Sequence, residues 1–255
     1  ADPRIAHEMT LAFDKFGNVA DQIAIAYPRR ALPVNLPEQG KILAVYTKSD
    51  YINTPELTEA GKEPDYHYIG LPYQRRTYEV TGLRWPPDQS ERQFRLSDFD
   101  DLNTEKDDGE QTEESIALPQ RLLKWNRTYF RPDDEAGILD GHPLALGKVE
   151  SLALPYASYQ VALSDALIKT VFVKNEGAPS FVTDDMLTEA QYHQEPGIDG
   201  YWWVPAGRQA FDPAKFYLPH RSSDPFGNFS TIAYDKHGLL VTQTTDPMGN
   251  RMLAQ

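Results

Sequence analysis

Apolar and polar residues alternate in several short stretches of the chain, as they do in half-buried β-strands. The first stretch is 7–30, where alternate residues are apolar on both sides of a polar segment at 14–18. This pattern predicts two antiparallel strands joined by a turn, with Pro28 ending the second strand. Shorter alternating stretches predict further strands at 41–47 and 75–81.

Three later stretches have a less uniform pattern. Residues 121–130 fit a helix or a strand, and the β-branched and aromatic residues at their end favour a strand. Apolar residues in 158–171 recur at helical spacing behind Ser158, which predicts a helix with that serine as its cap. A second, short helix is predicted at 184–192, after Thr183 as cap and with two aspartates in its first turn.

Nine acidic residues crowd the segment 98–114, and Phe99 and Leu102 are its only large apolar residues. So high a charge density predicts a solvated, mobile loop. A cation-binding loop is the alternative. The segment lacks the strict alternation and the bidentate glutamate of a calcium loop.

A turn signal recurs in the C-terminal stretch 224–250. The sequence DPFGN at 224–228 returns 22 residues later as DPMGN at 246–250, and YDKHG at 234–238 lies between them. Aspartate at the first corner can accept a backbone hydrogen bond, proline presets the next dihedral, and glycine and asparagine tolerate left-handed backbone. The spacing predicts strands over 229–233 and 239–245, each roughly 20 Å long.

The segment FDKFGN at 13–18 looks like a diverged copy of the same turn. A repeated strand–turn unit is therefore expected, because one such turn is common but several at regular spacing are not. The expected turn residues are Asp14, Gly17 and Asn18, then Asp224, Pro225, Gly227 and Asn228, then Tyr234, Asp235 and Gly238, and finally Asp246, Pro247, Gly249 and Asn250.

The amino-acid composition limits the fold classes and the kinds of binding site that the chain can have. The 255 residues include 14 tyrosines, 20 prolines and 16 glycines, which favours pleated sheet and many turns over long helices. Cysteine is absent, which excludes disulfides and cysteine-based metal sites. The net charge of −13 argues against binding to nucleic-acid backbones. No apolar stretch reaches the roughly 20 residues that span a bilayer, and the first residues contain neither a signal core nor an initiator Met, as expected of a processed piece or a fragment.

The sequence contains little catalytic chemistry. His7-Glu8 begins like a zinc-protease motif, but Leu11 stands where the second histidine should be, and the six histidines have no metal-ligand spacing. Neither a nucleophile elbow nor a phosphate-binding glycine loop is present. We therefore expect no catalytic residues, no metal and no cofactor. A hydrolase that uses one carboxylate pair among the 38 acidic residues remains an alternative.

The aromatic run Tyr201-Trp202-Trp203 has two interpretations. In a strand, successive side chains point to opposite faces, so one indole is expected in the core and the other at the surface or at an inter-strand contact. Structural packing is the simpler interpretation. Stacking on sugar rings, and hence a carbohydrate-binding β module, is the alternative.

The segment DPFGN…IAYDKHGLL…TDPMGN resembles the YD repeats of Rhs proteins. Other phrases resemble the B component of bacterial insecticidal Tc toxins more narrowly. They are FDKFGNVADQIAIAYPRR (13–30), LALGKVESLALPYASYQVAL (144–163), DGYWWVPAGR (199–208) and FYLPHRSSDPFGN (216–228). Together they cover most of the chain outside the acidic segment.

This resemblance implies a mainly β fold, in which antiparallel YD-repeat strands form part of a spiral β-shell, with one or two short helices. Residues 1–255 would be a single segment of that shell, in a secreted bacterial toxin complex. The shell would enclose a cytotoxic effector. The implied partners are the rest of the same toxin polypeptide, a C-type YD-repeat component with its enclosed effector and, indirectly, a pore-forming A component. Nucleic-acid binding and direct membrane insertion are not implied. The family's self-cleaving aspartyl protease site belongs to the C component and has no match here.

Overall fold

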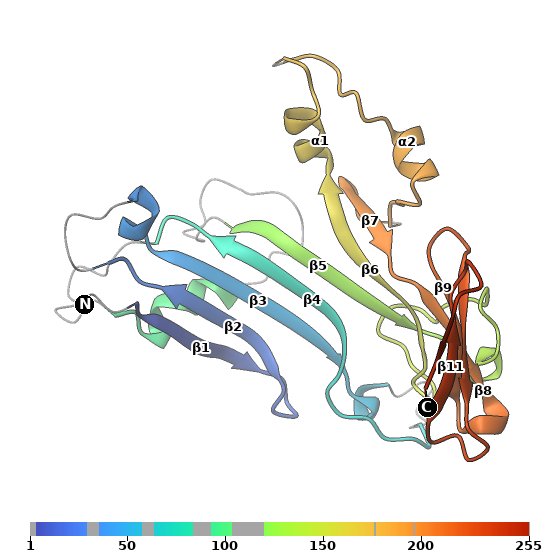
Figure 1. Cartoon of the computed structure of the whole chain (residues 1–255). Coiled ribbons are helices and arrows are strands. Elements are labelled where there is room, and N and C mark those ends of the chain that lie inside the picture. Colours follow the sequence, from blue (N-terminus) through green and yellow to red (C-terminus); the bar gives the residue numbers. More distant parts are fainter. Residues whose placement is uncertain are drawn as a thin grey trace. The chain divides into compact units, whose positions relative to one another are not determined.

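A computed structural model describes most of the chain, which is mainly antiparallel β-sheet (Figure 1). The described residues are 4–29, 36–57, 64–83, 93–103, 120–175, 177–195 and 197–254. The chain divides into two compact units, one formed by Ala1–Tyr51 with Gln74–Trp125 and the other by Ile52–Tyr73 with Asn126–Gln255. The expectation of one single segment stays a prediction.

Within each sheet of the described chain, every strand lies beside its neighbour in sequence. The seven-stranded sheet has the order β1-β2-β3-β4-β5-β6-β7, and the five-stranded sheet has the order β12-β11-β10-β9-β8. The strands are β1 (Ala6–Phe13), β2 (Val19–Ala26), β3 (Leu43–Ile52), β4 (Leu71–Val80), β5 (Gln120–Phe130), β6 (Pro155–Ser164), β7 (Tyr201–Pro205), β8 (Arg208–Asp212), β9 (Leu218–Ser223), β10 (Phe229–Tyr234), β11 (Val241–Thr245) and β12 (Arg251–Leu253).

The described helices are short. Two are α-helices, α1 (Asp165–Val171) and α2 (Asp184–Glu189). The 3-10 helices are η1 (Pro37–Gly40), η2 (Thr54–Glu56), η3 (Leu96–Asn103), η4 (Asp133–Glu135) and η5 (Pro213–Lys215). None of the described helices is long and apolar enough to cross a membrane.

The predicted mainly β fold with two short α-helices is confirmed. The hairpin of 7–30 is β1 and β2, and the stretches 41–47 and 75–81 fall in β3 and β4. The ambiguous stretch 121–130 is the strand β5. The short helix α2 begins where predicted, because the Thr183 hydroxyl accepts the backbone N–H of Met186.

The predicted helix over 158–171 is wrong in its first half. Residues 155–164 form β6, which pairs with β5 and β7, and α1 begins only at Asp165. Its cap is Ser164, whose hydroxyl accepts the N–H of Leu167, and not Ser158. The apolar positions before Ser164 fit both periods, and pairing with strands on both sides decides for the strand.

The first unit has a core between β1–β4 and η3. Its buried side chains include Ile23 and Ile25 of β2, Tyr46 of β3 and Val80 of β4. Tyr46 donates a hydrogen bond to the carboxylate of Asp21, which is also buried. Burial and this hydrogen bond raise the pKa of the Tyr46 phenol.

The predicted solvated loop over 98–114 is wrong where the structure describes it. Residues 98–103 belong to η3, in which Phe99 and Leu102 are only 1% and 6% exposed and join the core of the first unit. In a 3-10 helix, residues three apart lie on the same face, so these two side chains point inward together. Residues 104–114 lie outside the described part of the chain. Among the described residues, no group of three potential ligands could hold a metal ion.

A substitution in η3 tests this placement. We expect Phe99→Ala to reduce the free energy of unfolding by about 3–5 kcal/mol, because it opens a cavity in a packed core. Asp100→Ala, in the same helix but exposed, is the matched control and should change stability by less than about 0.5 kcal/mol. Urea unfolding followed by fluorescence measures both, and equal effects would contradict a core role for Phe99.

Candidate functional site: the repeated turns

Three turns with the sequence Asp-x-x-Gly-Asn share one hydrogen-bond pattern. They begin at Asp14, Asp224 and Asp246. One carboxylate oxygen accepts the backbone N–H two residues on, at 2.9 Å in all three turns. The same oxygen accepts the N–H of the closing asparagine, at 2.8, 2.9 and 2.8 Å. The second oxygen accepts that asparagine's side-chain amide, at 2.8, 2.9 and 2.8 Å.

The backbone closes these turns in the same way. The aspartate N–H donates to the asparagine carbonyl at 2.9, 2.8 and 3.0 Å. The glycines, Gly17, Gly227 and Gly249, have φ of 87°, 84° and 83°. This left-handed backbone strains any residue that has a Cβ atom. Thus the diverged copy at 14–18 has the same structure as the two later turns.

The turn at Tyr234-Asp235 is a longer variant. The N–H of Asp235 donates to the carbonyl of Leu240, five residues on, at 2.9 Å. One carboxylate oxygen accepts the N–H groups of Leu239 and Leu240, at 2.7 and 3.1 Å. The phenol of Tyr234 donates to the carbonyl of Pro219 at 2.9 Å, which ties β10 to β9. The side chains of Leu239 and Leu240 remain exposed.

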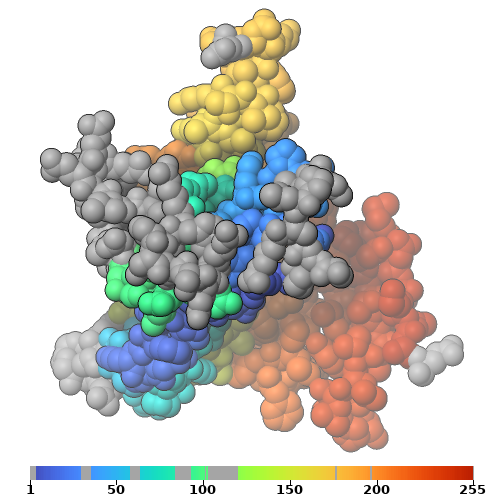
Figure 2. Space-filling view, turned by 90° about the vertical axis from the view of Figure 1, so that its left-hand side faces the viewer, coloured from blue at the N-terminus to red at the C-terminus, as the bar shows by residue number. Residues whose placement is uncertain are grey.

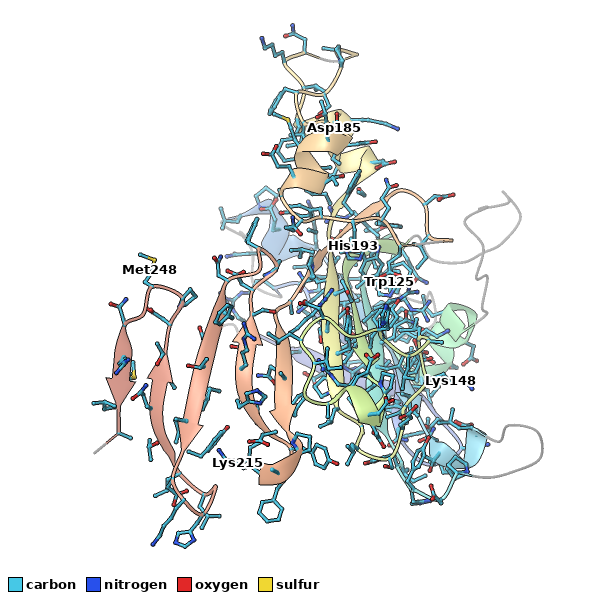
Figure 3. The ribbon with its side chains drawn as sticks, turned by 90° about the vertical axis from the view of Figure 1, so that its right-hand side faces the viewer. Trp125, Lys148, Asp185, His193, Lys215 and Met248 are labelled. Atoms are coloured by element: carbon cyan, nitrogen blue, oxygen red, sulfur yellow. The ribbon has the colours of Figure 1, made fainter. Side chains whose placement is uncertain are left out.

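The direction of each strand determines at which end of the five-stranded sheet the next turn lies. In an antiparallel meander, alternate connections lie at opposite ends of the sheet. The turns at 224–228 and 246–250 therefore share one end of the five-stranded sheet, and the connections 213–217 and 235–240 share the other. Figure 3 labels Met248 at the first end and Lys215 at the second.

The turn hydrogen bonds also affect ionisation. The pKa values of Asp224 and Asp246 are lowered, first by the side-chain amides of Asn228 and Asn250 and then by backbone N–H groups. The pKa of Asp235 is lowered chiefly by the N–H of Leu239. These carboxylates are therefore ionised at neutral pH, because the hydrogen bonds that they accept favour the charged form.

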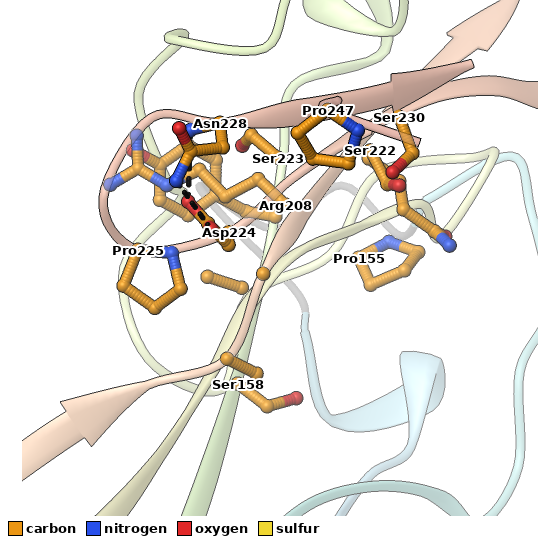
Figure 4. A pocket seen from close by; sticks show the side chains of 15 residues that line it. Pro155, Ser158, Arg208, Ser222, Ser223, Asp224, Pro225, Asn228, Ser230 and Pro247 are labelled. Carbon is orange, nitrogen blue, oxygen red and sulfur yellow. Dashed lines mark hydrogen bonds between the residues drawn. The ribbon is translucent and has the colours of Figure 1, made fainter. Parts of the chain in front are cut away.

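Two hollows adjoin the turns. A groove of about 490 Å³ lies between the start of β6 and the five-stranded sheet, and Figure 4 shows Asp224 and Asn228 along it. The guanidinium of Arg208 lies over the Tyr156 ring beside this groove, 4.5 Å from the ring centre. A smaller hollow of about 260 Å³ lies between the two turns, with Phe229 and Pro247 among its walls.

The aromatic run on β7 is packed. Trp202 is 4% exposed and packs with Ile168 of α1 and Leu187 of α2, whose segment is the yellow lobe in Figure 2. Trp203 is 0% exposed and lies under the guanidinium of Arg127, 5.3 Å from the ring centre. Of the two alternatives for the second indole, exposure at the surface is wrong and an inter-strand contact is confirmed, because Trp203 is buried under Arg127 of β5. Tyr201 is half-buried.

A polar cluster surrounds Glu195, which no motif in the sequence indicates. Its carboxylate accepts the phenol hydrogen bond of Tyr129 at 3.0 Å, and His193 and Arg127 approach it at 3.4 and 3.9 Å. The His193 hydrogen bond, ahead of the others, lowers the pKa of Glu195. Burial, followed by the charge of Glu195, raises the pKa of Tyr129 to about 12. The cluster attaches the segment after α2 to β5, and spacing in the sequence gave no signal for it.

Solved structures share the fold of this chain, and a family model matches its first part. The whole chain has the fold of part of a chain in a crystal structure of TcdB2-TccC3, with a TM-score of 0.63 and 20% sequence identity, covering 100% of this chain and 13% of that one. It matches TcdB2-TccC3-Cdc42 equally, at 0.63 and 19% over the same shares. It also matches the Photorhabdus luminescens Tc holotoxin pore, at 0.57 and 18%, covering 97% of this chain and 12% of that one.

Residues 1–57 match the family described as the insecticide toxin TcdB middle/C-terminal region. No curated protein matches the chain. The resemblance to the B component of Tc toxins, indicated by the sequence, is thus confirmed by the family match and the fold. The chain spans about an eighth of the length of the solved chains that it matches, at 13% and 12%.

Glycine substitutions test the turns. We expect Gly227→Val and Gly249→Val each to reduce the free energy of unfolding by about 1–3 kcal/mol. No atom lies within 4 Å of the added Cβ at either position, so the cost comes from backbone strain alone. Gly137→Ala, where φ is not positive and the nearest atom is 3.7 Å away, is the control. Unchanged melting temperatures in both valine variants would contradict the strained-turn interpretation.

The lowered carboxylate pKa values predict a dependence on pH. A group whose folded pKa is depressed contributes stability above its unfolded pKa, near 3.9 for aspartate, and that stability is lost as the pH falls through the folded value. We therefore expect the free energy of unfolding to decrease below about pH 4, and to decrease less steeply in Asp246→Asn. Asp140→Asn, an exposed aspartate outside the turns, should keep the wild-type slope in urea titrations.

Proposed function

We propose that this chain is a wall segment of a toxin-encapsulating β-shell, and that it helps to enclose and deliver a cytotoxic effector. The observation that carries the proposal is the strand order, in which the strands of each sheet pair with their neighbours in sequence. Such a chain forms two successive ribbons, β1–β7 and β8–β12. A ribbon can enclose a volume without building a separate core for each turn.

The ends of the ribbon support this role. Among the described residues, β1 has a single strand partner, β2, and β12 has a single partner, β11. An unpaired strand edge presents N–H and C=O groups that can accept another strand. In the proposed shell, the rest of the same polypeptide supplies those strands.

The proposed partners follow from the solved structures. TcdB2 occurs there together with TccC3, and the Tc holotoxin pore contains a similar chain. We infer that the present chain likewise acts with a C-type component and its effector, and indirectly with an A component, in a secreted complex. The chain itself would do no chemistry.

The aromatic residues at 201–203 do not support the carbohydrate-binding alternative. A sugar ring stacks on an exposed aromatic face, whereas Trp202 and Trp203 are both buried. The hydrolase alternative has no specific carboxylate pair in its favour, because the described carboxylates at the turns and at Glu195 are occupied by hydrogen bonds that stabilise the fold.

Protease protection tests the wall role. The full-length polypeptide that contains this chain would be produced with its C-type partner, and the effector segment probed by limited proteolysis. We expect the effector to be protected in the intact complex and digested after deletion of 224–254, since the deletion removes the last three turns with β10, β11 and β12 and opens the wall. Gly137→Ala provides a folded control with an intact wall. Full protection after the deletion would contradict the proposal.

A further inference from the structure

The five-stranded sheet has two edge strands, β8 and β12, whose outer edges have different surroundings. Among the described strands, β8 pairs only with β9, and β12 pairs only with β11. Each edge strand therefore has a row of backbone N–H and C=O groups that points away from the sheet. Such a row accepts a strand from elsewhere unless another part of the protein covers it.

The segment 131–138, which we call the edge cover, lies along the outer edge of β8. The Phe211 N–H donates to the carbonyl of Ala136 at 2.8 Å. The carbonyl of Gln209 accepts a hydrogen bond from Nη2 of Arg131 at 2.7 Å. Backbone groups alternate in direction along a strand, so Gln209 and Phe211 are the β8 residues whose groups point away from β9. The edge cover thus occupies the place where a further strand would pair.

The edge cover packs closely on β8 and is not itself extended. Ala136 is 1% exposed, and a Cβ atom added to Gly137 would lie 3.7 Å from the carbonyl of Phe211. Within the cover, η4 turns the backbone back on itself, and the N–H of Glu135 donates to the carbonyl of Pro132 at 3.2 Å. A 3-10 turn has no extended row of free groups. The cover therefore hides one strand edge without presenting another.

Arg131 holds the edge cover against β8. Its Nη1 donates to the carbonyls of Glu135 and Ile138 in the cover, while its Nη2 donates to Gln209 of β8. Its Nε donates to the carbonyl of Pro155, at the start of β6, at 3.3 Å. The planar guanidinium has five N–H donors in a fixed fork, which suits it to join several carbonyls at once. A lysine ammonium is a point charge with three donors, so it cannot join the same segments.

The outer edge of β12 is open in the part of the chain that the structure describes. All three of its residues, Arg251, Met252 and Leu253, are exposed. The N–H of Ala254 donates to the carbonyl of Thr242 on β11 at 3.1 Å, so by alternation the N–H of Leu253 points away from β11. The two edges of the sheet therefore differ, since β8 is covered and β12 is not.

We propose that the edge cover closes β8 to strand addition, and that Arg131 is the residue that positions the cover. The five-stranded sheet then gains strands at β12 alone, and its partner there is an extended segment that pairs along the β12 backbone. The ribbon β8–β12 thus has one direction of growth. The inference goes beyond the proposed wall role, because it concerns which edge of the sheet is open and not what the sheet encloses.

Sedimentation equilibrium tests the closure of β8 in a chain whose β12 edge is blocked. Leu253→Pro removes the outward N–H of β12, and we expect this variant to stay monomeric from micromolar concentration to about 1 mM. Adding Arg131→Lys should release the edge cover and expose β8. Two β8 edges can then pair antiparallel about a two-fold axis, which closes the assembly. The mass of this double variant should therefore rise with concentration to twice the monomer mass and no further.

Arg208→Lys, in the same Leu253→Pro background, is the matched control. The guanidinium groups of Arg208 and Arg131 both lie over the ring of Tyr156, at 4.5 and 5.7 Å from its centre. The Arg208 guanidinium is paired with the carboxylate of Asp140, at 3.8 Å, and not with the outer edge of β8. We therefore expect the control to stay monomeric.

Hydrogen exchange distinguishes an opened edge from a general loss of stability. In Arg131→Lys, we expect the Phe211 N–H to exchange at least about tenfold faster than in the wild type, because its acceptor in the edge cover moves away. The amides that pair β9 with β10 should keep their wild-type rates. If Arg131→Lys abolishes cooperative melting, Ala136→Glu takes its place, since a glutamate at this buried position displaces the cover.

Three results would overturn the proposal. The first is a double variant that stays monomeric at every concentration. The second is association of Leu253→Pro alone with slowed exchange at Phe211, because β8 would then be open in the native chain. The third is growth of the double variant beyond a dimer with fast exchange throughout β10, which would assign Arg131 to general stability. None of these results involves an effector, so they are distinguishable from failure of the protease-protection test.

Discussion

The aspartate carboxylate at the first corner of the tight turns is the constraint that sets the pairing of β1 with β2, of β9 with β10 and of β11 with β12. In each Asp-x-x-Gly-Asn turn it accepts three hydrogen bonds, two from backbone N–H groups and one from an asparagine side chain. These satisfy donors that would otherwise face water at a sharp reversal. Because the chain reverses direction within five residues, the following strand lies beside the preceding strand and pairs with it. Sequential pairing at these turns follows from local chemistry, whereas β2 to β7 pair in sequence order across longer connections.

The same locality explains which elements the sequence could predict. Turn residues at fixed spacing and alternating apolar residues depend on near neighbours, and they identified β1, β2, β10 and β11. The predictions that were wrong concern elements whose structure depends on contacts between residues far apart in the sequence. In β6, the stretch before Ser164 fits a helix or a strand, and β5 and β7 on either side decide between them. In η3, the acidic residues around Phe99 and Leu102 suggested solvent exposure, whereas the core of the first unit buries both side chains.

The candidate site was predictable to a similar extent. Its Asp, Gly and Asn residues could be identified from spacing, because each has a conformational role in the turn. The left-handed backbone at Phe216 could not, since aromatic residues have no preference for it. The burial of both Trp202 and Trp203 was also out of reach. It requires the α1–α2 segment to cover one face of β7 and Arg127 to cover the other, and these contacts come from distant parts of the sequence.

The chain passes from the first sheet to the second after β7. Arg131, which follows β5, makes hydrogen bonds to both sheets at this point. The side chain is 1% exposed, and its guanidinium donates to the carbonyls of Glu135, Ile138, Pro155 and Gln209. Burial lowers its pKa, yet the ring faces of Tyr156 and Phe211 and the carbonyls offset the desolvation of the charge. The last of those carbonyls belongs to β8, the first strand of the second sheet. One buried cation thus ties the start of β6 to β8, where the second sheet begins.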